Sequence, residues 1–321
     1  MVKRIIVGES GGPTPVIDWE VAGVIDAAQK AGIEVYGMIN GLQGLLNADI
    51  EGSVVDLTNM DPMSFVFNGP GAGLKTTRIK PGEPEYKRMA QNLKALGVDG
   101  VVYTGGNDSA DQVLGLTRVA DGVKAVHAIK TVDNDLPVTH HSPGFGSAAL
   151  YNATALKNVD NDFSSYGVKG HWKVDGNVIQ GASVAPVIVY QVMGRKAGWL
   201  ACATKFAAVD PKGDLCSDRA PHIVLCKENL FDKEEFLARV EEVMTEVGRC
   251  DIVVQEDLTD RNTGKSIAEV FGTEVVYDDH GNIQHGRSTS FSPASWLAQT
   301  IESELKVESI PGKIKDCVLN P

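Results

Sequence analysis

Cysteine is scarce and unpatterned in this chain of 321 residues. The five cysteines are odd in number, far apart and never spaced as Cys-x-x-Cys: Cys202, Cys216, Cys226, Cys250 and Cys317. Such usage indicates neither a disulfide framework nor a structural zinc site. We therefore expect a protein of the reducing cytoplasm.

Long apolar runs and an excess of positive charge are also missing. No hydrophobic stretch is long enough to cross a bilayer, and the apolar run at 5–7 is too short for a secretory signal. The 42 acidic residues outnumber the 30 Lys and Arg residues, so the formal net charge is −12. This charge argues against general binding to nucleic acid or membranes, and an anionic substrate would need a local cluster of cations.

Alternating strand-like and helix-like segments fill the chain instead. Because the length exceeds that of one typical core, we expect two α/β domains. The expected strands lie at 2–7, 34–39, 100–103, 125–129, 187–192, 222–225 and 251–254. The clearest expected helices lie at 17–31, 84–96, 147–156, 236–247 and 292–305. A polar stretch at 164–183 is an insertion with no pattern, and 275–283 indicates a hairpin.

Two glycine-rich turns follow expected strands. Gly11-Gly12 allows backbone N–H groups to approach an anion near a helix start, although a plain tight turn explains it equally well. The second turn continues into Asn107 and Asp108, whose oxygens suit Mg²⁺. Ser109 is either part of this site or simply the N-cap of the next helix.

Basic residues gather in two places. Lys75, Arg78 and Lys80 alternate with hydroxyls after a glycine cluster, which suits phosphate oxygens but also describes a solvated basic turn. Arg195 follows a buried strand where a helix is expected to begin. A cation there opposes the helix dipole unless it holds an anion, so a binding role is favoured.

The stretch 130–135, Lys-Thr-Val-Asp-Asn-Asp, places one cation and two carboxylates at the end of an expected strand. Ligands of parallel sheets bind beyond such strand ends, so this stretch is a candidate site. A solvated acidic turn is the structural alternative, because Asp and Asn favour turns for backbone reasons alone.

Taken together and in order, these motifs resemble those of the 6-phosphofructokinase family and in particular its pyrophosphate-dependent branch. They are Gly11-Gly12-Pro13, Arg78, 105–109, 130–135, 144–149 and 193–199. The resemblance implies two Rossmann-like three-layer α/β domains with mainly parallel sheets and the active site in the cleft between them. We expect residues 1–140 to bind the phosphoryl donor with Mg²⁺, and residues 141–321 to bind the sugar phosphate.

The same resemblance implies a role for each matching residue. Asp133 acts as the general base, with Arg78 and Thr131 completing the catalytic group. The implied donor-binding residues are Gly11, Gly12, Asp108, Ser109, Lys130 and Lys80, and the implied metal ligands are Asp108 and Asn107. The sugar phosphate is expected at Thr131, Asp133, Asp135, Met193, Gly194, Arg195, Glu228 and Lys315. A homo-oligomer, dimer or tetramer, is also implied.

Donor choice depends on two positions. By resemblance, members that use ATP usually carry Gly in place of Asp108 and lack Lys130. A carboxylate at Asp108 would repel the α-phosphate of a nucleotide, whereas pyrophosphate has no purine and needs a point charge. We therefore expect reversible phosphoryl transfer from pyrophosphate to the 1-hydroxyl of fructose 6-phosphate.

Other readings stay open at this point. ATP could be the donor, or sedoheptulose 7-phosphate the acceptor. A catalytically silent sugar-phosphate-binding subunit is suggested by Pro186, where relatives often carry a cation, and by the missing family segment after Pro321. Asn107 also stands where many members have Asp. We therefore expect the second domain to be incomplete at its C-terminus, with Lys315 as its last basic candidate.

Overall fold

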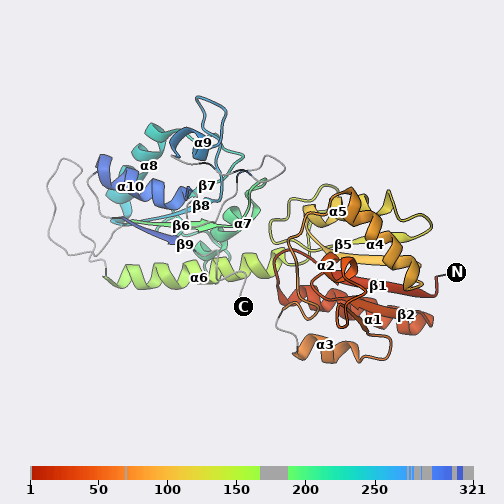
Figure 1. The fold of residues 1–321 in the computed structure, drawn as a ribbon. Coiled ribbons are helices and arrows are strands. Elements are labelled where there is room, and N and C mark those ends of the chain that lie inside the picture. The colour runs from red at the N-terminus through yellow and green to blue at the C-terminus, as the bar shows by residue number, and fades with distance from the viewer. Residues whose placement is uncertain are drawn as a thin grey trace. The chain divides into compact units, whose positions relative to one another are not determined.

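The computed structural model describes residues 2–68, 71–166, 187–272, 275, 277, 283, 291–305 and 309–313. These residues form two compact units (Figure 1). Unit 1 comprises Met1–Thr131 and Leu136–Gly144, and unit 2 comprises Val132–Asp135 and Phe145–Val318. The predicted division after residue 140 therefore differs slightly from the structural one. Residues 132–135 belong to unit 2 because Val132 is buried in the core of that unit.

Unit 1 is built on a five-stranded sheet with the order β3-β2-β1-β4-β5. Its strands are β1 Arg4–Glu9, β2 Glu34–Met38, β3 Val54–Asp56, β4 Gly100–Gly105 and β5 Lys124–Ile129. All neighbouring pairs are parallel except β2 and β3. The chain adds β2 on one side of β1 and β4 on the other. The loops after β1 and β4 therefore separate at the carboxyl edge of the sheet, which is where such sheets bind ligands.

Helices cover both faces of this sheet because successive strand residues point to opposite sides. The helices are α1 Pro15–Ala31, α2 Leu42–Leu46, α3 Pro62–Asn68, α4 Glu83–Ala95 and α5 Asn107–Thr117. Val7 packs in the core with α1, whereas its neighbour Ile6 packs in the core with α2, α4 and α5. Figure 1 shows α1 and α4 on opposite sides of the sheet. Unit 1 is thus a three-layer α/β domain.

Unit 2 repeats this plan with a parallel four-stranded sheet of order β7-β8-β6-β9. Its strands are β6 Val187–Val192, β7 Ile223–Leu225, β8 Cys250–Gln255 and β9 Ser309–Lys313. Its helices are α6 Phe145–Tyr166, α7 Trp199–Ala203, η1 Thr204–Ala208, α8 Lys233–Val247, α9 Ile267–Phe271 and α10 Pro293–Leu305. Val189 packs in the core with α8 and α10, and Tyr190 packs in the core with α6 and α7.

The expected fold class, two three-layer α/β domains with mainly parallel sheets, is confirmed. Pro186, Lys315 and most of the predicted insertion at 164–183 lie outside the described residues, as do most of those in the predicted hairpin at 275–283. Tyr277 and Ile283 do form an antiparallel bridge in that hairpin. In the described part of the chain, no helix is long and apolar enough to span a membrane.

Candidate active site

The turn after β1 is open above its backbone. Gly11 has a φ of +81°, a left-handed conformation that favours glycine, and a Cβ built on it would have no atom within 4 Å. A ligand can therefore approach the backbone closely. The buried Lys130, which follows β5, donates from Nζ to the carbonyl oxygen of Gly12 at 2.6 Å. The structure thus brings Lys130 and the Gly11-Gly12 turn together.

Strand β4 lies between β1 and β5 in the sheet, so its end lies between the Gly11-Gly12 turn and Lys130. Gly105 has no room for a side chain, since a Cβ there would clash with the side chain of Ser109. The backbone N–H of Lys130 donates to the Gly105 carbonyl at 2.9 Å, which fixes the start of the 130–135 loop beside the turn.

Helix α5 begins three residues earlier than it would if Ser109 were its N-cap. Its N-cap is Gly106, so Asn107, Asp108 and Ser109 are its first three residues. The alternative in which Ser109 is the N-cap is therefore wrong. The first N–H groups of a helix have no partner within the helix and attract anions. The Ser109 side chain is only 2% exposed and packs at Gly105, whereas Asp108 is exposed.

The segment that carries Arg78 is tied to the same edge of the sheet. Near β2, the Leu74 carbonyl accepts from the Asn40 N–H at 2.8 Å. Beyond Arg78, the Ile79 carbonyl accepts from Gln112 Nε2 on α5 at 2.7 Å. Between these anchors, Arg78 is exposed, as are the flanking candidates Lys75 and Lys80. The backbone thus positions this cationic segment, and its charged side chains extend into solvent.

The loop with the candidate base is closed at its root. Thr131 pairs with Gly144 in a parallel bridge, and its N–H donates to the Pro143 carbonyl at 3.1 Å. Asp133 and Asp135 are half-buried on either side of Asn134, whose φ of +55° is a left-handed conformation that Asn tolerates. The turn reading therefore accounts for Asn134 itself.

In unit 2, the sugar-phosphate candidates follow the carboxyl ends of β6 and β7. Met193 is half-buried, Gly194 has a φ of +120°, and Arg195 is exposed. The expected helix start at Arg195 is wrong, because α7 begins only at Trp199. The left-handed Gly194 instead turns the chain, so the helix-dipole argument for Arg195 does not apply.

Glu228 has a structural partner in the same unit. Its Oε1 accepts from the Gly198 N–H at 2.8 Å, which holds the turn between β6 and α7. A side chain at Gly198 would clash with Cys226 and lie 2.7 Å from Glu228 Oε2. In this conformation, Glu228 therefore orients the Met193–Arg195 turn through Gly198.

Buried carboxyl groups lie beneath the Gly11-Gly12 turn. Glu9 ends β1 and Asp18 lies in the first turn of α1, and their exposures are 0% and 1%. Burial raises the pKa of Glu9 to about 9, with the charge of Asp18 as the next cause. Burial also raises the pKa of Glu20 to about 7, whereas Thr104 and the charge of Lys130 lower it. The sequence analysis did not identify this group.

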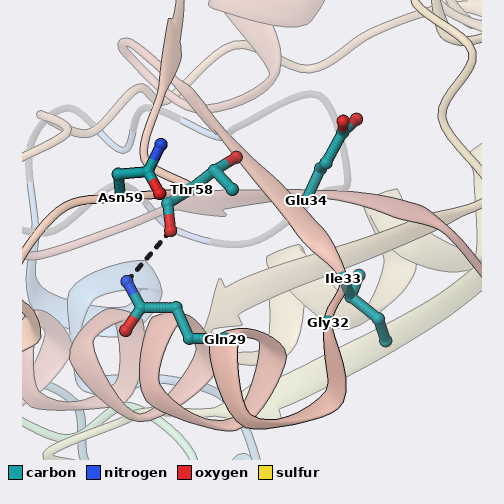
Figure 2. A pocket seen from close by; sticks show the side chains of 6 residues that line it. All are labelled: Gln29, Gly32, Ile33, Glu34, Thr58 and Asn59. Carbon is teal, nitrogen blue, oxygen red and sulfur yellow. Dashed lines mark hydrogen bonds between the residues drawn. The ribbon is translucent and has the colours of Figure 1, made fainter.

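A polar pocket of about 540 Å³ lies at the opposite edge of the unit 1 sheet (Figure 2). It is lined by the end of α1 and the start of β2, and Gln29 Nε2 donates across it to the Thr58 carbonyl at 3.0 Å. Its one charged lining residue, Glu34, pairs with Arg4. The pocket therefore offers no catalytic group.

Comparison with known proteins assigns these motifs to one family. The phosphofructokinase family model matches residues 4–171. The chain belongs to the phosphofructokinase family. It is 33% identical over 313 residues to the pyrophosphate–fructose 6-phosphate 1-phosphotransferase of Xanthomonas campestris, covering 94% of this chain and 67% of the relative. The enzyme of that name from Rhodospirillum rubrum is 32% identical over 314 residues, covering 95% and 69%.

A solved structure gives the same result. The pyrophosphate-dependent phosphofructokinase of Nitrosospira multiformis superposes with a TM-score of 0.73 at 29% identity, over 99% of this chain and 70% of that one. The predicted resemblance to the pyrophosphate-dependent branch is confirmed by these relatives. The chain spans about two thirds of the length of each of these relatives.

The family generally uses a divalent metal cation for phosphoryl transfer. No cluster of three or more His, Cys, Asp or Glu side chains in the described residues could hold one alone. Asn107 and Asp108 offer oxygen donors at the start of α5. Mg²⁺ is commonly held by one or two carboxylates, waters and substrate phosphates. This donor set therefore fits a cation that binds together with the phosphate groups of the donor.

Two acidic residues at the carboxyl end of β8 were not among the predicted site residues. Glu256 and Asp257 follow β8, which pairs with β6 so that Val192 lies opposite Gln255. Both carboxylates are nearly buried, and Asp257 pairs with Lys227 at 2.7 Å. Both acids could have been predicted from their position directly after a parallel strand, which is the feature that identified Asp133.

Proposed function

We propose that this chain transfers a phosphoryl group from pyrophosphate to the 1-hydroxyl of fructose 6-phosphate, giving fructose 1,6-bisphosphate in a reversible reaction of glycolysis. The single observation that carries the donor assignment is the contact of Lys130 with the open Gly11-Gly12 turn. Asp108 follows β4, the strand that lies between β1 and β5 in the sheet. Asp108 and Lys130 are the positions at which the resemblance separates the two donor branches.

The proposed mechanism begins with alignment of the donor on unit 1. The open turn at Gly11-Gly12 and the start of α5 offer backbone N–H groups to phosphate oxygens. Lys130 and Arg78 neutralise the charge of the donor, and Lys80 extends this basic segment. Asn107 and Asp108 would hold Mg²⁺, which supplies further charge neutralisation when bound with pyrophosphate.

The sugar phosphate is bound by groups of unit 2 in this proposal. Arg195, with the turn of Met193 and Gly194, holds the 6-phosphate. Glu228 also contacts the sugar phosphate, and its Oε1 accepts from the Gly198 N–H. Asp133 takes the proton of the sugar's 1-hydroxyl while the oxygen of that hydroxyl forms a bond to the transferring phosphorus. The bond from this phosphorus to the bridging oxygen of pyrophosphate breaks, and phosphate leaves. Thr131 and Asp135 position the reactants. Lys315 stays a proposed ligand of the sugar phosphate.

The proposed cellular location and oligomeric state rest on the sequence and not on the geometry of the site. We assign the reaction to the cytoplasm because the cysteine pattern suits a reducing compartment. We also expect a homo-oligomer, as the family resemblance implies.

The test compares donors and a base variant on the purified chain. We expect fructose 1,6-bisphosphate to form with pyrophosphate and not with ATP, and fructose 6-phosphate to be preferred over sedoheptulose 7-phosphate. Asp133→Ser should lower the rate by about 10²–10⁴, the usual contribution of a general base. Asp121→Ser, in an exposed turn, is the matched control.

Two outcomes would reject parts of the proposal. Turnover with ATP alone would reject the donor assignment. Equal background rates in the wild type and in Asp133→Ser would instead support a sugar-phosphate-binding subunit without catalysis.

A further inference from the structure

The Glu9 and Asp18 carboxyl groups hold one short piece of backbone between them. Glu9 Oε2 accepts from the Leu74 N–H at 2.9 Å, and Asp18 Oδ1 accepts from the Gly73 N–H at 2.6 Å. Residues 73 and 74 lead directly to the segment that carries Arg78. Two adjacent amides far away in sequence are thus bound by side chains of the β1–α1 unit.

After burial, the charge of Asp18 is the largest cause of the raised pKa of Glu9. The second oxygen of Glu9 is fully buried and receives no hydrogen bond from a protein N–H or O–H group, and the neighbouring acid is Asp18. Two ionised carboxylates in such a place would repel each other without solvent to screen them. One shared proton removes the repulsion and supplies the missing O–H donor. The pair is therefore best described as one acid and one carboxylate.

We propose that Glu9 and Asp18 are positioning residues for phosphoryl transfer: as a pair that shares one proton, they fix the Gly73–Leu74 backbone and thereby the placement of Arg78. Glu9 ends β1, one residue before the Gly11-Gly12 turn, and Asp18 lies on the helix that follows it. The pair therefore links the turn expected to hold the donor to the cation expected to stabilise the transferring group. The link to catalysis rests on the proposed function, whereas the backbone contacts do not.

This arrangement predicts a loss of positioning at alkaline pH. Burial, Asp18 and Glu20 raise the pKa of Glu9 to about 9, against the lowering effect of the Leu74 amide. Glu20 in turn faces Lys130. Because the folded-state pKa lies above the ordinary value, the protonated form is the native one. The shared proton is present at lower pH and is lost as the pH rises through about 9.

The experiment measures kcat and KM for pyrophosphate between pH 6 and 10 in the wild type, Glu9→Gln and Glu9→Ala. Glutamine can accept from Leu74 and donate permanently to Asp18. We expect Glu9→Gln to retain activity and to lose the decline near pH 9. Glu9→Ala should lower kcat/KM at neutral pH about ten- to a hundredfold, the scale of a small misplacement of a catalytic group. Asp26→Asn, which changes a half-exposed carboxyl on α1 whose ion pair is with the exposed Lys30, should match the wild type.

Hydrogen exchange of peptides from 71–79 provides a readout that does not depend on activity. We expect faster exchange in Glu9→Ala and exchange like the wild type in Glu9→Gln. The inference is overturned if Glu9→Gln keeps the alkaline decline, or if Glu9→Ala changes neither exchange nor kcat/KM. If the wild type does not turn over pyrophosphate, the proposed function fails, and the exchange of 71–79 still decides whether the pair holds this backbone.

Discussion

Lys130 illustrates how one side chain can serve both structure and chemistry. A cation that is only 5% exposed is costly to bury, and the Gly12 carbonyl is one of its partners. The Glu20 carboxyl lies close enough for the Lys130 charge to lower its pKa against the effect of burial. The Lys130 ammonium thus stabilises the Gly11-Gly12 turn and places a positive charge beside it.

We expect Lys130→Met to lower kcat/KM for pyrophosphate at least about tenfold, since a charge-assisted contact of about 1.5–3 kcal/mol is lost. The variant should also be less stable by about 1–3 kcal/mol, because the Gly12 carbonyl loses a buried donor. Steady-state kinetics and urea denaturation measure the two effects. Lys124→Met, at the exposed start of β5, is the control. Undiminished pyrophosphate activity in Lys130→Met would remove the donor role of this residue.

At the scale of single elements, most strands could be predicted closely from the sequence. The apolar pattern predicted β6 with its observed bounds. The predicted bounds of β1, β2, β4, β5, β7 and β8 lie within two residues of the observed ones. The edge strand β9 was missed because it contains Pro311 and Gly312, which weaken any strand pattern. Proline is tolerated there because β9 lies at the edge of its sheet. Strand β3 was not predicted either, because it is only three residues long and follows a turn.

The two glycine turns should respond differently to a methyl group. Gly11→Ala meets open space but must adopt a positive φ, so we expect a loss of about 1 kcal/mol. Gly105→Ala would clash with Ser109, and we expect a larger loss of about 1–3 kcal/mol together with a shifted start of α5. Chemical denaturation checks this order. Equal losses, or a smaller one at Gly105, would contradict the packing at the end of β4.

At the scale of the whole molecule, the class of fold could be predicted because strand-like and helix-like segments alternate along the chain and central strands such as β6 and β8 are apolar runs buried on both faces. The sequence also located the motifs at strand ends. It could not identify the Glu9–Asp18 pair, because the partners of these acids lie in a loop 65 and 55 residues away. The sequence alone assigns Glu9 an ordinary carboxylate, whereas burial and the charge of Asp18 raise its pKa to about 9.

The division into two units predicts which peptides each substrate protects from hydrogen exchange. With Mg²⁺ and pyrophosphate, we expect hydrogen exchange to slow in peptides covering 8–14 and 105–109 of unit 1. With fructose 6-phosphate, we expect slower exchange at 193–198 of unit 2. Each ligand is measured alone against the free protein. Protection of 193–198 by pyrophosphate alone, with none at 8–14, would reverse the assigned domain roles.

The anchoring of the Arg78 segment has a consequence for how this protein can change. Its backbone is fixed at Leu74 and Ile79, while the side chains of Lys75, Arg78 and Lys80 extend into solvent. Substitutions of Lys75 and Arg78 cost little folding energy, since exposed charges contribute little to stability. Selection or engineering can therefore vary the affinity for phosphate over a wide range without first acquiring compensating mutations in the core.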